Sequence, residues 1–225
     1  MKLLAVDSNS ILNRAFYGVR PLTTREGQFT NGIYGFLNIL FKLLEETSPD
    51  AVAFAFDLKA PTFRHKLYSE YKAQRKGMPE ELAQQLQPLK DLLVLMGYPL
   101  IMVEGYEADD ILGTLAESCR QKGYECVIAT GDRDSFQLVG GSVSVRLAST
   151  RGGQSAAEMI DEDAIREKYG LAPAQMALCL VSRKHRSDLL GKRFGNLRQA
   201  RLHILMHRRL GYSKHAGRLP HGRAG

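Results

Sequence analysis

Seven acidic residues stand at the ends of the segments that the sequence predicts, and most of them fall between Glu104 and Asp134. The seven are Asp7, Asp57, Glu107, Asp109, Asp110, Asp132 and Asp134. Like charges gathered at one place repel each other, so a fold keeps them only where a cation or basic groups neutralise them. Donor sets made only of oxygen suit Mg²⁺ or Mn²⁺ rather than zinc. The pattern therefore predicts a divalent-metal centre.

The chemistry that such a centre performs depends on how many ions it holds. Two ions about 4 Å apart activate a water molecule and stabilise the leaving oxygen in phosphodiester hydrolysis. Asp132 and Asp134 would point the same way if the backbone there is extended. A single Asp after a strand is more often a turn former or a helix cap, and Asp109 and Asp110 could simply favour a helix N-terminus. Seven separate caps explain the whole set poorly, and we expect hydrolysis of a phosphate ester.

A second candidate region, Thr62–Lys76, interleaves basic and aromatic side chains. Its cations are Arg64, Lys66, Lys72, Arg75 and Lys76, and its tyrosines are Tyr68 and Tyr71. Cations pair with phosphates and aromatic rings stack on unpaired bases, so the segment predicts contact with nucleic acid. Taken alone, it could equally be a solvated amphipathic helix. We expect its histidine, His65, to be a surface or substrate-side residue rather than a metal ligand.

The segments that must position these residues alternate between apolar runs and helical patterns. Strands are predicted at 2–6, 51–56, 99–103 and 126–129, with an edge strand at 142–147. Helices are predicted at 11–18, from Thr30 or Asn31 to 46, at 79–96 with a kink or break at Pro88, at 108–122 and at 161–169. This order is typical of a three-layer α/β domain with a mostly parallel sheet. Because parallel strands present their carboxyl ends at one edge, the seven acids should meet there.

Composition excludes several classes of protein. Among 225 residues, 44% are apolar, which is enough for a core, yet no apolar run reaches the length of about 18–20 residues needed to span a membrane. The N-terminus meets an acid too early for a signal peptide. Three cysteines without a C-x-x-C pair suit buried, reduced thiols, so we expect a cytoplasmic location. Walker, dinucleotide-binding and G-x-S-x-G motifs are absent.

Charge divides the chain near residue 180. The net charge is +7, but residues 181–225 hold nine Arg, three Lys and a single acid, together with five of the six His. The preceding residues carry more acids than bases. The alternation of strands and helices also stops there, and we expect the tail to be poorly ordered because it lacks a sustained apolar pattern.

Several runs of sequence, in order, carry a resemblance to a known family. They are A-V-D-S-N-S-I-L-N-R-A-F-Y-G, P-L-T-T-R-E-G-Q-F-T-N-G-I-Y-G-F, A-F-D-L-K-A-P-T-F-R-H, Y-K-A-Q-R, G-Y-E-A-D-D-I-L-G-T-L and T-G-D-R-D. The chain resembles the N-terminal 5′→3′ exonuclease domain of bacterial DNA polymerase I, within the PIN-like flap endonuclease superfamily. The resemblance covers about residues 2–177.

The resemblance implies a PIN-like domain with a helical arch insert and the activity of a structure-specific 5′ nuclease. Such a nuclease uses two Mg²⁺ ions to trim 5′ ends and flaps of DNA, and RNA primers, in replication and repair, with polymerase domains on the same chain. By motif match, the first ion would be held or bridged by Asp7, Asp57, Glu107, Asp109 and Asp110, and the second by Asp132 and Asp134. Lys72 and Arg75, in the arch, would grip the scissile phosphate and the 5′ strand. Arg64 and Tyr71 would add further contacts to the nucleic acid.

The resemblance stops near residue 178, so we divide the chain into a domain at 1–177 and a basic tail at 178–225. The family there has G-D-x-S-D-N-I-P-G, followed by a helix–hairpin–helix that binds duplex DNA. This chain has S-R-K-H-R-S-D-L-L-G-K-R-F-G-N, with His185 where the first Asp of the motif belongs and Asp188 at its Ser-Asp pair. We favour a shifted reading frame or a truncated gene over a genuine basic tail. We therefore expect an incomplete second ion site, loss of the helix–hairpin–helix, and weak or absent activity.

Two other interpretations stay open at this point. The chain could be a catalytically inactive, nucleic-acid-binding remnant of DNA polymerase I. It could also be a different acidic α/β enzyme, such as a Mg²⁺ phosphatase that acts on small phosphoesters. The basic aromatic insert at Thr62–Lys76 argues against the phosphatase, because a small substrate needs no such surface.

Overall fold

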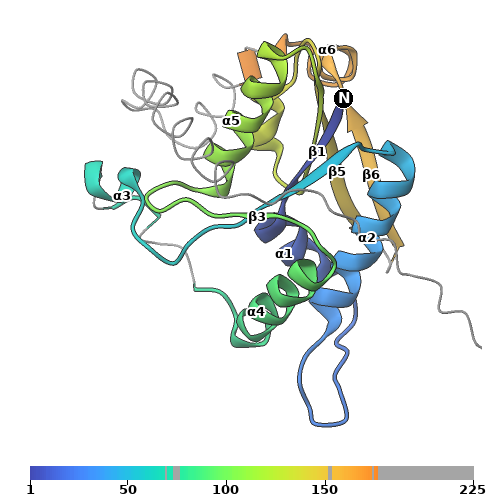
Figure 1. Cartoon of the computed structure of the whole chain (residues 1–225), viewed down its shortest axis with the longest axis vertical. Coiled ribbons are helices and arrows are strands. Elements are labelled where there is room, and N and C mark those ends of the chain that lie inside the picture. Colours follow the sequence, from blue (N-terminus) through green and yellow to red (C-terminus); the bar gives the residue numbers. More distant parts are fainter. Residues whose placement is uncertain (69, 73–76, 152–153, 174, 177–225) are drawn as a thin grey trace, which may run out of the picture.

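One six-stranded sheet organises the fold in the order β3-β2-β1-β4-β5-β6 (Figure 1). The structure is a computed structural model, and it describes residues 1–68, 70–72, 77–151, 154–173 and 175–176. The strands are β1 (Lys2–Asp7), β2 (Ala51–Ala55), β3 (Leu100–Ile101), β4 (Glu125–Thr130), β5 (Val143–Arg151) and β6 (Gln154–Ile160). The first five are parallel, and β6 pairs antiparallel with β5. The predicted α/β class with a mostly parallel sheet is confirmed.

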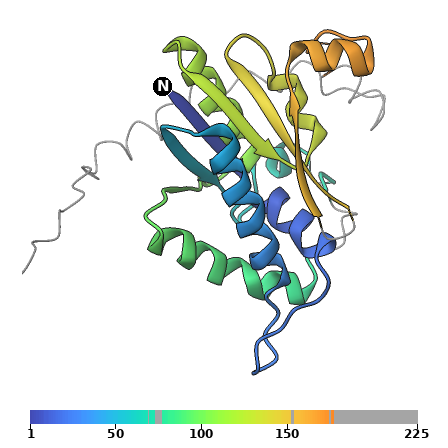
Figure 2. The ribbon, with the colours of Figure 1, turned by 90° about the vertical axis from the view of Figure 1, so that its right-hand side faces the viewer.

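Helices cover both faces of the sheet, which gives the three predicted layers (Figure 2). On one face lie α1 (Ser8–Gly18), α2 (Asn31–Thr47) and α4 (Glu80–Leu95); on the other lie α5 (Ala108–Gln121) and α6 (Glu162–Tyr169). Alternate strand residues serve the two layers, because successive side chains of a strand point to opposite faces. Leu4 and Val6 of β1 thus pack with the first group of helices, while Ala5 packs with the second.

The region from β4 to β6 differs most from the prediction. We predicted an edge strand at 142–147, but β5 is longer and is covered by β6, which the sequence analysis missed. The residues of β6, Q-S-A-A-E-M-I, show no clean alternation of apolar and polar positions. Between β4 and β5 lies a 3-10 helix, η1 (Arg133–Leu138). Asp132 is extended but Asp134 lies in η1, so the condition for the two acids to point the same way, an extended backbone, is not met.

Two further elements depart from the expected pattern. The third strand, β3, holds two residues rather than five. Pro88 lies inside α4, which continues through it, so the expected break does not occur. Pro88 removes one hydrogen bond and crowds the preceding turn, but the buried leucines Leu82, Leu89 and Leu93 keep both halves of the helix on the core. In the basic segment, the described helix is the short α3 (Phe63–Leu67).

Cys119 and Cys126 are free and buried, as predicted for structural thiols. Cys179 and the basic tail lie outside the described residues. Within the described ranges, no helix has both the length and the apolar character that crossing a membrane requires.

Candidate active site

The ends of three neighbouring strands supply the first group of acids. Asp7 closes β1, Asp57 follows β2 by two residues, and Asp132 follows β4 by two residues. In the sheet, β1 lies between β2 and β4, with Asp7 opposite Ala55 and Val6 opposite Ala129. This register brings the three carboxylates to one edge of the sheet, as the parallel topology predicted.

Short polar side chains at the start of α1 fix these strand ends to each other. Asn9 accepts a hydrogen bond from the backbone amide of Asp57 (3.3 Å), and the hydroxyl of Ser10 accepts one from the amide of Gly131 (3.0 Å). Asp7 itself caps α1 by accepting from the amide of Ser10 (3.1 Å). Our sequence analysis assigned no role to these partners, although D-S-N-S carries a usable signal: small polar residues that directly follow a strand-ending acid.

The N-terminus of α5 supplies the second group of acids. Glu107 occupies the N-cap position, and its backbone amide donates to the carboxylate of Asp110 (3.0 Å). Asp57 accepts from the amide of Ala108 (2.7 Å), which ties the end of β2 to this helix. An N-terminus favours negative charge because its amides lack partners within the helix. The capping interpretation of single acids is thus correct for Glu107 and Asp110, yet both also face the basic segment.

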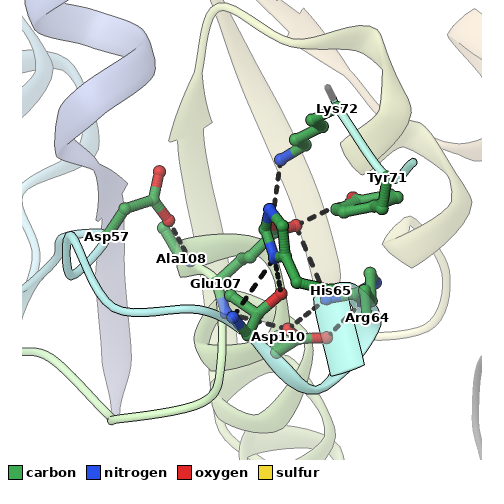
Figure 3. Close-up of polar contacts among 9 residues, drawn as sticks. Asp57, Arg64, His65, Tyr71, Lys72, Glu107, Ala108 and Asp110 are labelled. Carbon is green, nitrogen blue, oxygen red and sulfur yellow. Dashed lines mark hydrogen bonds and ion pairs between the residues drawn. The ribbon is translucent and has the colours of Figure 1, made fainter. Parts of the chain in front are cut away.

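Three side chains of the basic segment converge on these two acids, as Figure 3 shows. Arg64 forms a bidentate pair with Asp110, both N–O distances being 2.7 Å, and it also approaches Glu107 at 3.5 Å. Tyr71 donates its hydroxyl to Glu107 (3.1 Å), and the Lys72 ammonium lies 2.7 Å from the other Glu107 oxygen. Glu107 and Asp110 are therefore largely neutralised by the chain itself.

The titration of this basic group reflects the pairing. Burial by itself lowers the pKa of Arg64, but its hydrogen bonds to Asp110 and the charges of Asp110 and Glu107 outweigh burial and raise it. Burial and the charge of Glu107 raise the pKa of Tyr71. Both side chains thus keep their protons and donate to carboxylates. His65 contacts the Thr62 hydroxyl at the start of α3 and packs edge-on against the ring of Tyr71, so it supports the basic segment.

Asp109 lies among carboxylates from four separate segments. Loss of water around its carboxylate and the charges of Asp132, Glu107 and Asp57 together raise its pKa to about 6, although the residue as a whole is exposed. Burial and the charge of Asp109 raise the pKa of Asp7 to about 7, although hydrogen bonds from Ser10 and Thr130 act in the opposite direction. The structure therefore brings Asp7, Asp57, Glu107, Asp109 and Asp132 into one electrostatic cluster, which we call the carboxylate cluster.

The remaining predicted residues are placed differently. Asp110 turns to Arg64, and Asp134 lies in η1, where its amide donates to the carboxylate of Asp132 (3.0 Å). Arg75 lies outside the described residues. In the described part of the chain, no three Asp, Glu, His or Cys side chains are arranged, as they stand, to hold a metal ion.

A hollow beside Asp132 adds residues that the sequence analysis did not single out. It has a volume of about 400 Å³ and is lined by Ser10, Asn13, Arg14, Tyr17, Gly131 and Asp132. Arg14 donates to the carbonyl of Gly131, so a cation from α1 reaches the turn after β4. The carboxylate cluster thus has the basic segment near Glu107 and a partly basic hollow near Asp132.

Comparison with known proteins matches this arrangement to a family. The model of the 5′-3′ exonuclease, N-terminal resolvase-like domain, matches residues 2–170. The chain belongs to this family. It is 43% identical over 171 residues to DNA polymerase I of Caldicellulosiruptor bescii and, over the same length, to that of Pseudomonas aeruginosa. Each match covers 76% of this chain, but only 20% and 18% of those relatives. The chain thus spans about a fifth of the length of these polymerases.

Solved structures agree on the fold. The bacteriophage T5 flap endonuclease, in a pseudo-enzyme–product complex with DNA and metal ions, matches with a TM-score of 0.56 at 18% identity. That match covers 81% of this chain and 65% of the phage protein. The T5 5′-exonuclease with bound zinc ions gives a TM-score of 0.55 at 20% identity, covering 78% and 64%. The predicted PIN-like, flap endonuclease fold is confirmed for the described domain, while loss of the helix–hairpin–helix stays a prediction.

Proposed function

We propose that this chain is a metal-dependent 5′ nuclease that hydrolyses phosphodiester bonds at the 5′ ends and flaps of DNA, and at RNA primers. One observation carries the proposal: Asp109 is surrounded by the charges of acids from β1, β2, β4 and its own helix, beside a segment rich in cations. Acids whose surroundings raise their pKa values, as happens for Asp7 and Asp109, are typical of functional sites. Membership of the exonuclease family, and a likeness to nucleases crystallised with metal ions and DNA, agree with it.

The donor chemistry of the cluster fits Mg²⁺ or Mn²⁺, because every donor is a carboxylate oxygen. We propose that Asp7, Asp57, Glu107, Asp109 and Asp110 serve a first ion, and that Asp132 and Asp134 serve a second. Bound there, the ions would supply an activated water and stabilise the leaving oxygen. Cation binding would also remove the repulsion that raises the pKa values of Asp7 and Asp109, so metal affinity should rise with pH as these groups ionise.

The basic segment would hold the substrate. Lys72 and Arg64 are paired with Glu107 and Asp110, and both side chains could transfer to a phosphate that enters the site. Arginine matches phosphate with a planar pair of donors, whereas lysine acts as a point charge. Tyr71 offers a ring next to Lys72, suited to stacking on an unpaired base. Arg75 would extend this surface.

We further propose that cleavage is slow, because the second ion lacks part of its ligand set. Asp132 and Asp134 are the acids that we assign to this ion, but the sequence has His185 where the family motif has an Asp. An ion with too few carboxylates binds weakly, and the orientation of the remaining ligands suffers. Activity should therefore keep rising with Mg²⁺ well into the millimolar range.

A cleavage assay on a labelled 5′-flap duplex with Mg²⁺ tests the proposal. We expect measurable cutting that Asp109→Asn reduces by about a thousandfold or more, since it removes the central carboxylate. Asp91→Asn is the matched control, because Asp91 is an exposed acid on α4 that accepts only a local hydrogen bond from Gln87. It should cut like the wild type.

Other outcomes of the same assay would replace the proposal. Binding of the flap without cutting, at any Mg²⁺ or Mn²⁺ concentration, would make the chain a nucleic-acid-binding remnant of a polymerase. Turnover of a small phosphomonoester with no effect on the flap would make it a phosphatase. Equal cutting by the wild type and Asp109→Asn would mean that the carboxylate cluster is not the active site.

A further inference from the structure

Thr130 connects the two halves of the carboxylate cluster. It is the last residue of β4 and is completely buried. Its hydroxyl oxygen lies 2.8 Å from a carboxylate oxygen of Asp7, and the backbone amide of Asp132 lies 3.0 Å from the same hydroxyl. One side chain therefore contacts an acid assigned to the first ion and the turn that carries the acids assigned to the second.

The direction of these two hydrogen bonds is fixed by chemistry. A backbone amide can only donate, so the Asp132 amide donates to the hydroxyl, and when Asp7 is ionised the single hydroxyl proton points to its carboxylate. The second oxygen of Asp7 accepts from the amide of Ser10 (3.1 Å). Asp7 is thus held at both oxygens, once from α1 and once from β4, which fixes the orientation of its carboxylate.

The contact continues beyond Asp132. The Asp132 carboxylate accepts from the amide of Asp134 (3.0 Å), where η1 begins. A chain of hydrogen bonds therefore runs from Asp7 to the Thr130 hydroxyl, then to Asp132, and then to the backbone amide of Asp134. A change in the position of Asp7 would be transmitted through short hydrogen bonds to the turn after β4.

We propose that Thr130 is a positioning residue that orients Asp7 and the Asp132–Asp134 turn together, so that both groups of carboxylates are set for divalent cations. This inference rests on the proposed function. Thr130 itself touches neither the cation nor the substrate. Groups that orient metal ligands in this way typically contribute 10- to 100-fold to metal affinity.

Mn²⁺ binding to the folded protein, without substrate, tests the proposal by electron paramagnetic resonance and calorimetry. Thr130→Val keeps the shape of the side chain but removes the hydroxyl, and we expect it to weaken Mn²⁺ binding by about 10- to 100-fold. Thr130→Ser keeps the hydroxyl and should restore affinity to within about threefold of the wild type. In metal-free protein, hydrogen exchange at the Asp132 amide should become faster in Thr130→Val only.

Thr47→Val is the matched control for losing a buried threonine hydroxyl. Thr47 is also buried and donates its hydroxyl to the Leu43 carbonyl within α2, away from the cluster. This variant should lower the thermal midpoint by an amount similar to Thr130→Val, yet bind Mn²⁺ like the wild type. If Thr130→Val does not fold, Thr130→Ala replaces it, with the same expected loss of affinity.

Three results would overturn the proposal. Unchanged Mn²⁺ affinity in folded Thr130→Val or Thr130→Ala would reduce Thr130 to a structural residue, while leaving the proposed nuclease function intact. A loss that Thr130→Ser does not restore would mean that the methyl group, and not the hydroxyl, matters. Absence of Mn²⁺ binding by the wild type, together with absence of flap cleavage, would overturn both this inference and the proposed function.

Discussion

The carboxylate cluster has a side where acids are paired with basic residues, around Glu107, and a side where they are not, around Asp7 and Asp109. On the paired side, Glu107 and the adjacent Asp110, which lies outside the cluster, contact Arg64, Tyr71 and Lys72 at hydrogen-bonding distances. Asp7 is buried, Asp109 is exposed beside other acids, and their pKa values rise to about 7 and about 6. The paired side is already stable, whereas the unpaired side keeps a repulsion that a cation would relieve. The cost of building the site therefore falls mainly on Asp7 and Asp109.

The largest effect that separates the two sides is the pH dependence of stability in metal-free protein. Burial and Asp109 raise the pKa of Asp7 from 3.8 to about 7. The folded state thus binds more protons than the unfolded state between these values, so stability falls as pH rises through this window. Relative to Asp7→Asn, the wild type should lose up to about 4 kcal/mol between pH 3.5 and pH 8. Urea unfolding at a series of pH values measures the difference.

The same variant has an internal control for lost hydrogen bonds. Asparagine cannot accept equally from Thr130 and Ser10, but that cost is constant with pH and does not alter the slope. Saturating Mg²⁺ at pH 8 should stabilise the wild type and leave Asp7→Asn nearly unchanged, because binding to the folded state adds stability. A difference between the two proteins that stays flat from pH 3.5 to pH 8 would contradict the assignment of Asp7 to the unpaired side.

On the paired side we expect a smaller change in stability, caused by losing an ion pair rather than by relieving repulsion. Arg64 is buried in all but 15% of its side chain and holds Asp110 with two hydrogen bonds. Arg64→Gln should destabilise the metal-free protein by about 2–3 kcal/mol, because it leaves Asp110 and Glu107 buried with fewer partners. The matched control is Arg166→Gln on α6. Arg166 also pairs with two acids, Glu162 and Asp163, but 62% of its side chain is exposed.

The control should lose less than about 0.5 kcal/mol, since exposed ion pairs contribute little. Chemical unfolding in low salt, with Mg²⁺ removed by chelation, compares the two variants. Equal losses of unfolding free energy in the two variants would show that the buried Arg64 pair contributes no more to stability than the exposed Arg166 pair. A gain in stability in Arg64→Gln would show that the two acids are better solvated than their burial suggests.

How much the sequence predicts depends on whether the cause is local. Strand-ending acids, the α/β class and the mostly parallel sheet follow from periodicity and charge, and the structure agrees with each of these predictions. β6 was missed because its residues do not alternate cleanly, and it is held by pairing with β5, which is a tertiary effect. The break that we allowed for at Pro88 does not occur, since burial of α4 on the core outweighs one missing hydrogen bond.

The site shows the same limit. The acids were found because seven of them recur at segment ends. The pairing of Arg64 with Asp110 spans 46 positions in the chain, so no spacing rule connects them. Thr130 belongs to the T-G-D-R-D run, but its contact with Asp7 follows only from the pairing of β1 with β4. Partners across strands require the fold, while residue types at strand ends do not.

The smallest of the expected effects lies where the two sides meet. Lys72 pairs with Glu107 and lowers the pKa of Asp109 through its charge. Lys72→Met removes a cation that competes for Glu107, so Mn²⁺ should bind about two- to fivefold more tightly, in line with a partly exposed ion pair worth about 0.5–1 kcal/mol. Cleavage of the 5′ flap should fall at the same time, because the phosphate loses a partner.

Tighter metal binding together with slower cleavage would indicate that Lys72 and the cation compete for Glu107. A general loss of structure would instead weaken both metal binding and cleavage. Lys66→Met is the matched control, because Lys66 lies exposed on α3 in the same basic segment. It should leave Mn²⁺ affinity unchanged and weaken DNA binding only through the lost charge. If Lys72→Met binds Mn²⁺ less tightly than the wild type, Lys72 does not compete with the cation. The cation would then bind while Lys72 stays paired with Glu107.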